Sequence, residues 1–103
     1  MTFNLLVEPE ALDDIQQAVD WYNMQKKGLG KRFFNVVRKS FKTLAKNPFF
    51  AVRYDNVRCL SVEKFPFLIH YTVDEQNKQI QVFAVINTNR NPDLWIERAE
   101  NIE

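Results

Sequence analysis

The sequence has little glycine, proline and cysteine. Its 103 residues include two Gly, four Pro and one Cys. So few chain-breaking residues exclude a low-complexity or fibrous chain, and the single thiol, Cys59, excludes a disulfide within the chain. Apolar residues make up 46% of the sequence. That fraction is enough to build a core, so we expect one folded domain over residues 1–103.

Long apolar runs and targeting segments are also absent from the sequence. No run approaches the ~20 residues that a membrane span needs. The first ten residues, MTFNLLVEPE, lack the basic segment and the long apolar segment of a signal peptide. We therefore expect a cytoplasmic protein with no membrane partner.

The sequence offers few groups for metal or cofactor chemistry. It has one His and one Cys, and no cluster with the spacing of metal ligands. It has no glycine-rich phosphate loop. We therefore expect no metal and no cofactor. His70 lies in the middle of an expected strand, and we interpret it as a packed or edge-exposed histidine rather than a catalytic one.

Charge is unevenly distributed along the chain, although the net charge is only +1. Residues 1–25 carry five acidic residues and no Lys or Arg. Residues 26–64 carry eleven basic residues against two acidic ones, a local net charge of +9. This segment is a candidate surface for an anionic partner. The alternative is a solvated basic helix face.

Hydrophobic periodicity predicts an α+β fold with the order β-α-α-β-β-β and a short C-terminal helix. The expected strands cover 3–7, 57–63, 67–73 and 79–87, and the expected helices cover 9–27, 31–46 and 92–99. Short connections predict a helical hairpin and an antiparallel meander of the last three strands. The hairpin should cover one face of the antiparallel sheet, leaving the opposite face and its basic rim free, with the first strand beside the last.

Spacing also predicts which side chains face the core. The expected inward residues are Leu12, Ile15, Val19 and Tyr22 in the first helix, Phe34, Val37, Phe41 and Leu44 in the second, and Ile80, Val82, Ala84 and Ile86 in the last strand.

Metal-free RNA cleavage would require a base, a cation and an acid near one phosphate. The candidate cations are Arg53, Arg58 and Arg90, and the candidate acids and bases are Glu63, His70 and Tyr71. Strand alternation places His70 and Tyr71 on opposite faces of the sheet. At most one of them can join a single cluster, which argues against an enzyme.

Three motifs occur in order along the chain: WY followed by GLGKRF, the strand FPFLIHY, and the ending RNPDLW. Together they resemble the RelE/ParE toxin superfamily of bacterial type II toxin–antitoxin modules, over nearly the whole chain. The resemblance implies the β-α-α-β-β-β fold and a cytoplasmic, growth-inhibiting toxin of the plasmid-stabilisation class. It also implies a cognate antitoxin that wraps an acidic segment around the hairpin and the sheet, forming a toxin–antitoxin hetero-oligomer.

The superfamily divides by target. RelE-like members cut messenger RNA on the ribosome, and ParE-like members inhibit DNA gyrase. Arg90 and Arg58 match RelE-like positions, and with Tyr71 they would be the catalytic residues of a ribonuclease. However, Leu68 stands where a catalytic arginine is usual, and Asn87 stands where many relatives carry a histidine. The resemblance therefore favours a ParE-like gyrase inhibitor. A ribosome-dependent endoribonuclease and a degenerate, non-toxic antitoxin-binding module are the alternatives.

Polar residues follow the last strand, where the resemblance places target recognition. The alternative is a solvated turn rich in Asn. Contact with the target or the antitoxin is assigned to Arg38, Lys42, Arg53, Asn87, Asn89, Arg90 and Trp95.

Overall fold

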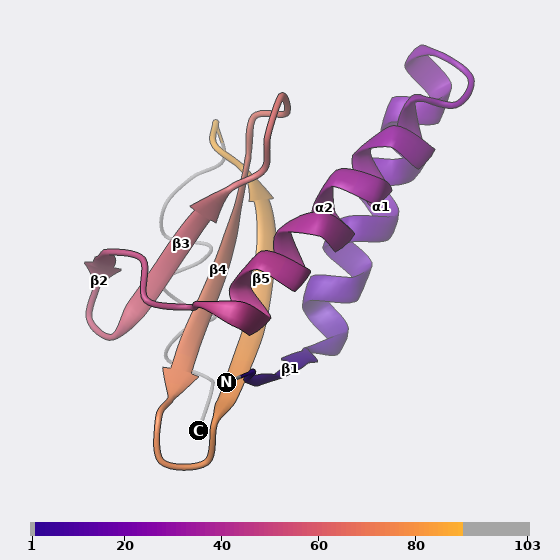
Figure 1. Cartoon of the computed structure of the whole chain (residues 1–103). Coiled ribbons are helices and arrows are strands. Elements are labelled where there is room, and N and C mark those ends of the chain that lie inside the picture. The colour runs from indigo at the N-terminus through magenta and orange to yellow at the C-terminus, as the bar shows by residue number, and fades with distance from the viewer. Residues whose placement is uncertain (1, 90–103) are drawn as a thin grey trace.

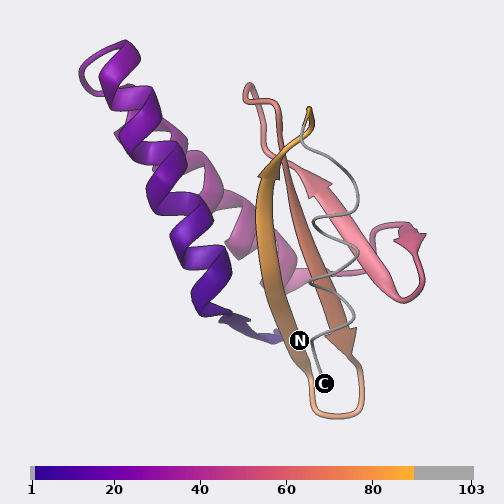
Figure 2. The same cartoon turned by 180° about the vertical axis from the view of Figure 1, so that it is seen from behind.

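A computed structural model describes residues 2–89 of the chain. Its elements are β1 (Asn4–Val7), α1 (Pro9–Gln25), α2 (Leu29–Lys46), β2 (Val52–Tyr54), β3 (Val57–Ser61), β4 (Phe67–Asp74) and β5 (Gln79–Asn87). The two helices form a hairpin that lies on one side of the sheet, with the end that joins the helices standing away from the strands (Figures 1 and 2). This confirms the predicted α+β fold. The helix predicted over 92–99 lies outside the described residues.

The sheet has five strands in the order β1-β5-β4-β3-β2. β1 runs parallel to β5, as its predicted place beside the last strand allows, and the other neighbours are antiparallel. The sheet is therefore mixed, whereas an antiparallel sheet was expected. The short edge strand β2 was not predicted.

Two glycines and a proline shape the helical hairpin. Pro9 begins α1, where its missing N–H costs no hydrogen bond. Gly28 precedes α2 with a φ of 88°, a left-handed conformation that suits glycine. Gly30 lies where the two helices are in close contact: a Cβ there would be 2.3 Å from the carbonyl oxygen of Val19. Its backbone N–H donates a hydrogen bond to Oδ1 of Asn23 at 2.9 Å.

The inward faces of the helices differ from the predicted stripes. The buried residues are Ala11, Ile15, Ala18 and Tyr22 in α1, and Gly30, Phe33, Val37 and Leu44 in α2. Leu12 is 55% exposed and Phe34 is 42% exposed, so their assignment to the core is wrong. In α1, Ile15 and Tyr22 are buried as predicted. Ala11 and Ala18 are buried with them, and their small side chains let α1 lie close to β5.

A β-bulge reverses the faces of β5. Tyr71 pairs with Val82 and His70 pairs with Ala84, so Phe83 is an extra residue between them. Before the bulge, Val82 packs in the core under the helices, and after it Ala84 belongs to a second cluster. The prediction that Ile80, Val82, Ala84 and Ile86 share one face is therefore wrong. In β4 the alternation is as predicted: Phe67, Ile69, Tyr71 and Val73 pack in the helix-side core.

Both faces of the sheet bury apolar side chains. The second cluster contains Val57, Phe83, Ala84 and Ile86, with Tyr54 and Cys59 packed against it. These four core residues are at most 4% exposed. The expectation of a free second face is therefore wrong.

Candidate functional site: a groove between α1 and β5

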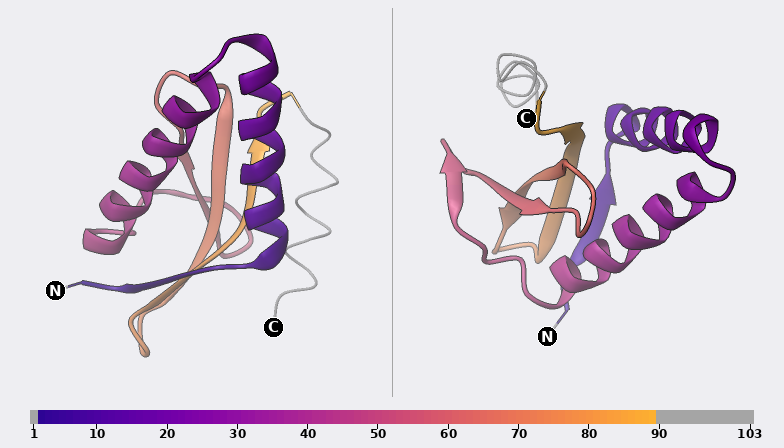
Figure 3. Two further views of the ribbon diagram at one scale, coloured as in Figure 1. Left: turned by 90° about the vertical axis from the view of Figure 1, so that its right-hand side faces the viewer. Right: turned by 90° about the horizontal axis from the view of Figure 1, so that it is seen from above.

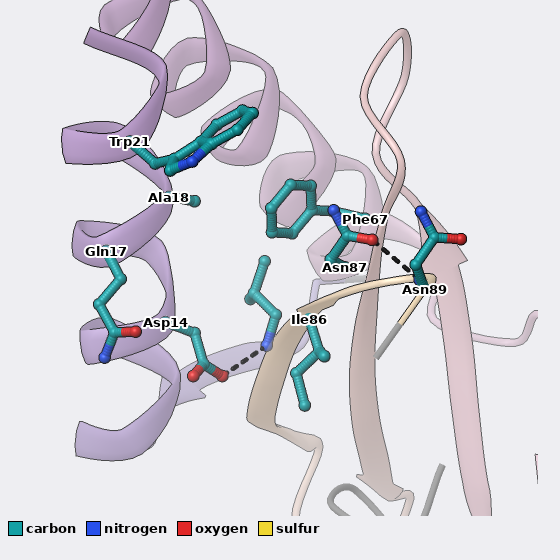
Figure 4. Close-up of a pocket in the computed structure, with 9 residues that line it drawn as sticks. Asp14, Gln17, Ala18, Trp21, Phe67, Ile86, Asn87 and Asn89 are labelled. Carbon is teal, nitrogen blue, oxygen red and sulfur yellow. Dashed lines mark hydrogen bonds between the residues drawn. The ribbon is translucent and has the colours of Figure 1, made fainter. Parts of the chain in front are cut away.

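A groove of about 430 Å³ lies between α1, the start of β4 at Phe67 and the end of β5 at Asn87 (Figure 4). Its lining combines apolar and polar side chains from both layers of the fold. The lining residues are Asp14, Gln17, Ala18, Trp21, Phe67, Val85, Ile86, Asn87 and Asn89. A concave surface that combines apolar side chains with polar groups is typical of a binding site.

The groove follows an incompletely paired strand edge. β1 pairs with β5 only from Gln79 to Val82. The chain then leaves the sheet: the backbone N–H of Glu8, the residue before α1, donates to the carbonyl oxygen of Val82 at 2.8 Å. The Val85 N–H then donates to Oδ2 of Asp14 at 3.0 Å (Figure 4). The carboxylate thus satisfies a buried backbone donor that has no strand partner on this side.

Trp21 is the largest side chain at the groove. It is 56% exposed and packs edge-to-face on Tyr22, with ring centroids 5.0 Å apart. Figure 4 shows its ring extending from α1 toward the strands, on the same side as Ala18 and Asp14. A large aromatic side chain that is half exposed beside an apolar surface is typical of a binding anchor.

Two predicted contact residues lie at the groove. Asn87 is half-buried and Asn89 is exposed. The side-chain oxygen of Asn87 accepts a hydrogen bond from the backbone N–H of Asn89 at 2.8 Å. This local bond ends β5 in a tight turn, and it fixes the amide side chain of Asn87 at the mouth of the groove. The structure shows the turn that was one of the two alternatives, and contact of Asn87 and Asn89 with a target or an antitoxin stays a prediction.

Arg58 and Tyr71, candidate catalytic residues, are cross-strand partners on the helix side of the sheet. The Tyr71 hydroxyl donates to the carbonyl oxygen of Pro48 at 2.7 Å. The Arg58 guanidinium donates to the carbonyl oxygen of Phe50 and lies 5.5 Å from the centre of the Phe49 ring. The two side chains together fix the segment that leads from α2 to β2.

The environment of Tyr71 makes it a weak acid. Its side chain is fully buried. Burial raises its pKa to about 12. A hydrogen bond with the Phe50 backbone and the positive charge of Arg58 act to lower the pKa, but they are weaker than the effect of burial. Tyr71 therefore stays protonated at neutral pH and serves as a hydrogen-bond donor inside the core. Its catalytic role, like that of Arg58, stays a prediction.

The other face of the sheet holds a cluster around His70, which is 1% exposed. Its Nδ1 lies 3.1 Å from the Tyr54 hydroxyl and 3.4 Å from Sγ of Cys59. Burial raises the pKa of both Tyr54 and Cys59, while the neighbouring Arg53 acts to lower that of Cys59. The position of His70 confirms that it is packed and that it lies opposite Tyr71.

The remaining predicted contact residues either do not line the groove or lie outside the described residues. Arg53 is exposed on β2 at one edge of the sheet, and Arg38 and Lys42 are exposed on α2. Arg90 and Trp95 lie outside residues 2–89. Within those residues, no three His, Cys, Asp or Glu side chains gather as metal ligands would, and neither α1 nor α2 could cross a membrane.

Sequence reasoning missed Asp14 and Trp21. Asp14 had a sufficient explanation as an acidic group near the start of a helix. Their spacing could have grouped them: Asp14, Ala18 and Trp21 recur at steps of four and three, which places them on one flank of α1.

Known proteins share this fold. A structure of the chromosomal ParDE system from P. aeruginosa matches with a TM-score of 0.73 and 21% identity, over 84% of this chain and 96% of that one. A double mutant of the E. coli toxin RelE in its free state matches with a TM-score of 0.75 and 13% identity, over the full length of both chains. A RelBE toxin–antitoxin complex from Mycobacterium tuberculosis matches with a TM-score of 0.60 and 12% identity, over 84% of this chain and 99% of that one.

No curated protein sequence matches the chain. A family match covers most of it: residues 5–92 match the family described as the ParE toxin of the type II toxin–antitoxin system parDE. The ParE-like interpretation of the sequence motifs is thus supported, and the chain belongs to the ParE toxin family.

Proposed function

We propose that this chain is the toxin of a type II toxin–antitoxin module, that it acts in the cytoplasm, and that the groove between α1 and β5 receives a segment of its antitoxin. The groove carries the proposal. It combines an apolar floor, an exposed aromatic side chain and a strand edge that β1 leaves incompletely paired.

The groove favours an amphipathic segment of the antitoxin. Apolar side chains of such a segment would pack on Ala18, Trp21 and Ile86, while polar ones would meet Gln17 and Asn87 at the rim. The names of the similar structures support a protein partner of this kind, because two of them describe toxin–antitoxin systems or complexes.

We propose DNA gyrase as the target, inhibited by protein–protein contact. Membership of the ParE family supports this choice. The contacts of Arg58 and Tyr71 support it as well, because both side chains hold backbone carbonyl groups between residues 48 and 50. In this arrangement Tyr71 is inaccessible to a phosphate of messenger RNA.

Two readouts test the target. Expression of the chain without its antitoxin should stop growth and give filamentous cells with DNA-damage signalling, and co-expression of the antitoxin should restore growth. Purified gyrase should lose supercoiling activity in an excess of the chain. Normal supercoiling, together with cuts at defined codon positions of messenger RNA in primer extension, would identify the ribosome rather than gyrase as the target. Tight antitoxin binding without a growth defect would identify a non-toxic binding module.

A further inference from the structure

One face of α2 carries all six basic side chains of this helix, and we call it the α2 basic face. It consists of Lys31, Arg32, Arg38, Lys39, Lys42 and Lys46, all of them exposed. At about 100° and 1.5 Å per residue, these positions fall within an arc of about 120° and span about 22 Å of helix. α2 contains no acidic residue.

Nothing in the described part of the chain neutralises this charge. Within residues 2–89, none of the six side chains forms an ion pair, and Arg38 has one notable contact, a position 5.9 Å from the centre of the Phe34 ring. Like charges four residues apart, as in Arg38 with Lys42 and Lys42 with Lys46, destabilise a helix. α2 packs into the fold through its other face, through Phe33, Val37 and Leu44. The fold therefore does not require the α2 basic face.

The composition of the α2 basic face favours nucleic acid over protein. Protein interfaces are depleted in lysine and centre on buried aromatic or apolar anchors. Four of the six cations here are lysines, and the exposed apolar side chain beside them, Phe34, lies at the border of the face rather than its centre. Lysine-rich surfaces without a central anchor are what phosphate backbones bind, through charge and with little dependence on sequence.

The shape of the α2 basic face favours duplex DNA over duplex RNA. It lies on α2, which Figure 3 shows as a straight helix, and the outer side of a helix is convex. The major groove of B-form DNA admits a helix, whereas the major groove of A-form RNA is too narrow for one. We propose that the α2 basic face binds the phosphate backbone of duplex DNA. No residue of α2 lines the groove between α1 and β5, so this is a second, separate surface.

The test measures binding of the purified chain to a duplex DNA of arbitrary sequence at several salt concentrations, by fluorescence anisotropy. The test variant is Lys31→Gln with Lys42→Gln, and the matched control is Lys64→Gln with Lys78→Gln. All four lysines are exposed, and the control pair lies in the turns of the sheet layer. The logarithm of the affinity should fall linearly with the logarithm of the salt concentration, and the test variant should lower that slope by about two units, one for each lysine. The control should leave the slope within about half a unit of the wild-type value.

Several results would overturn the proposal: the same slope in the test variant as in the wild type, an equal loss in both variants, tighter binding to duplex RNA, or displacement of the DNA by polyglutamate at equal charge concentration. Circular dichroism checks that the test variant folds, and it should be at least as stable as the wild type because it removes like-charge repulsion. The assay contains neither gyrase nor antitoxin, so its outcome is independent of the proposed target.

Discussion

The carboxylate of Asp14 in α1 accepts a hydrogen bond from the backbone N–H of Val85 in β5, at 3.0 Å. Two segments far apart in the sequence meet here, at the point where β1 no longer pairs with β5. The contact fixes one wall of the groove relative to the other. It therefore links the stability of the fold to the shape of the candidate binding site.

Asp14→Ala should destabilise the protein by about 1–3 kcal/mol, because the buried N–H of Val85 loses its acceptor. Asp14→Asn keeps a carbonyl oxygen in place and should cost less. Urea unfolding monitored by tryptophan fluorescence measures both. The neighbouring Asp13 is exposed, so Asp13→Ala should change the stability by about 0.5 kcal/mol or less. Equal losses for the two alanine variants would show that the effect comes from helix charge instead.

Gly30→Ala should loosen the helical hairpin. The added Cβ would lie 2.3 Å from the Val19 carbonyl oxygen and 2.7 Å from the Asn23 side chain. A backbone atom cannot move away cheaply, so we expect a loss of about 2–3 kcal/mol even though Ala is the better helix former. Gly28→Ala is the comparison, because Gly28 has open space around it but a φ of 88°. It should cost about 1–2 kcal/mol. Thermal unfolding measures both variants. A larger loss of stability in Gly28→Ala than in Gly30→Ala would contradict this explanation.

Tyr71→Phe should destabilise the protein by about 1–3 kcal/mol, because the Pro48 carbonyl group loses its donor. The variant also changes the pH dependence. Burial raises the pKa of Tyr71 from 10.0 to about 12, so the folded state holds this proton more tightly than the unfolded state does. The contribution to stability is complete below pH 10 and is lost as the pH rises toward 12. The free energy of unfolding of the wild type should therefore fall more steeply over this range than that of Tyr71→Phe, and parallel curves would refute the assignment.

The order of helices and strands could be predicted from sequence because most segments carry one clear period. β4 is the best case: its alternation places Tyr71 in the core under the helices and His70 on the other face, as observed. The link between the helices could also be predicted from sequence, because the left-handed conformation at this turn favours glycine, which is present as Gly28.

The two faces of β5 could not be predicted from its sequence pattern. It is apolar on both faces after Val82, so alternation gives no information on register, and the bulge at Phe83 could not be inferred. β2 escaped prediction because a three-residue edge strand leaves almost no periodic signal.

The candidate site was predictable only in part. Asn87 and Asn89 stood out because polar residues after an apolar strand mark its end. The α1 wall of the groove depends on which flank of the helix faces β5, and small residues such as Ala18 decided that by close packing. The apolar spacing favoured large side chains as the core contacts of α1, but one of them, Leu12, is exposed.

A comparison of Trp21 with Leu12 tests whether the groove holds the antitoxin. Both belong to α1 and are 56% and 55% exposed, respectively. They lie about two and a half turns apart, hence on opposite flanks of the helix. Titration calorimetry should show that Trp21→Ala weakens antitoxin binding by about tenfold or more, the loss expected of an aromatic anchor, while Leu12→Ala binds as tightly as the wild type. Unchanged affinity in Trp21→Ala, or an equal loss in Leu12→Ala, would contradict the account.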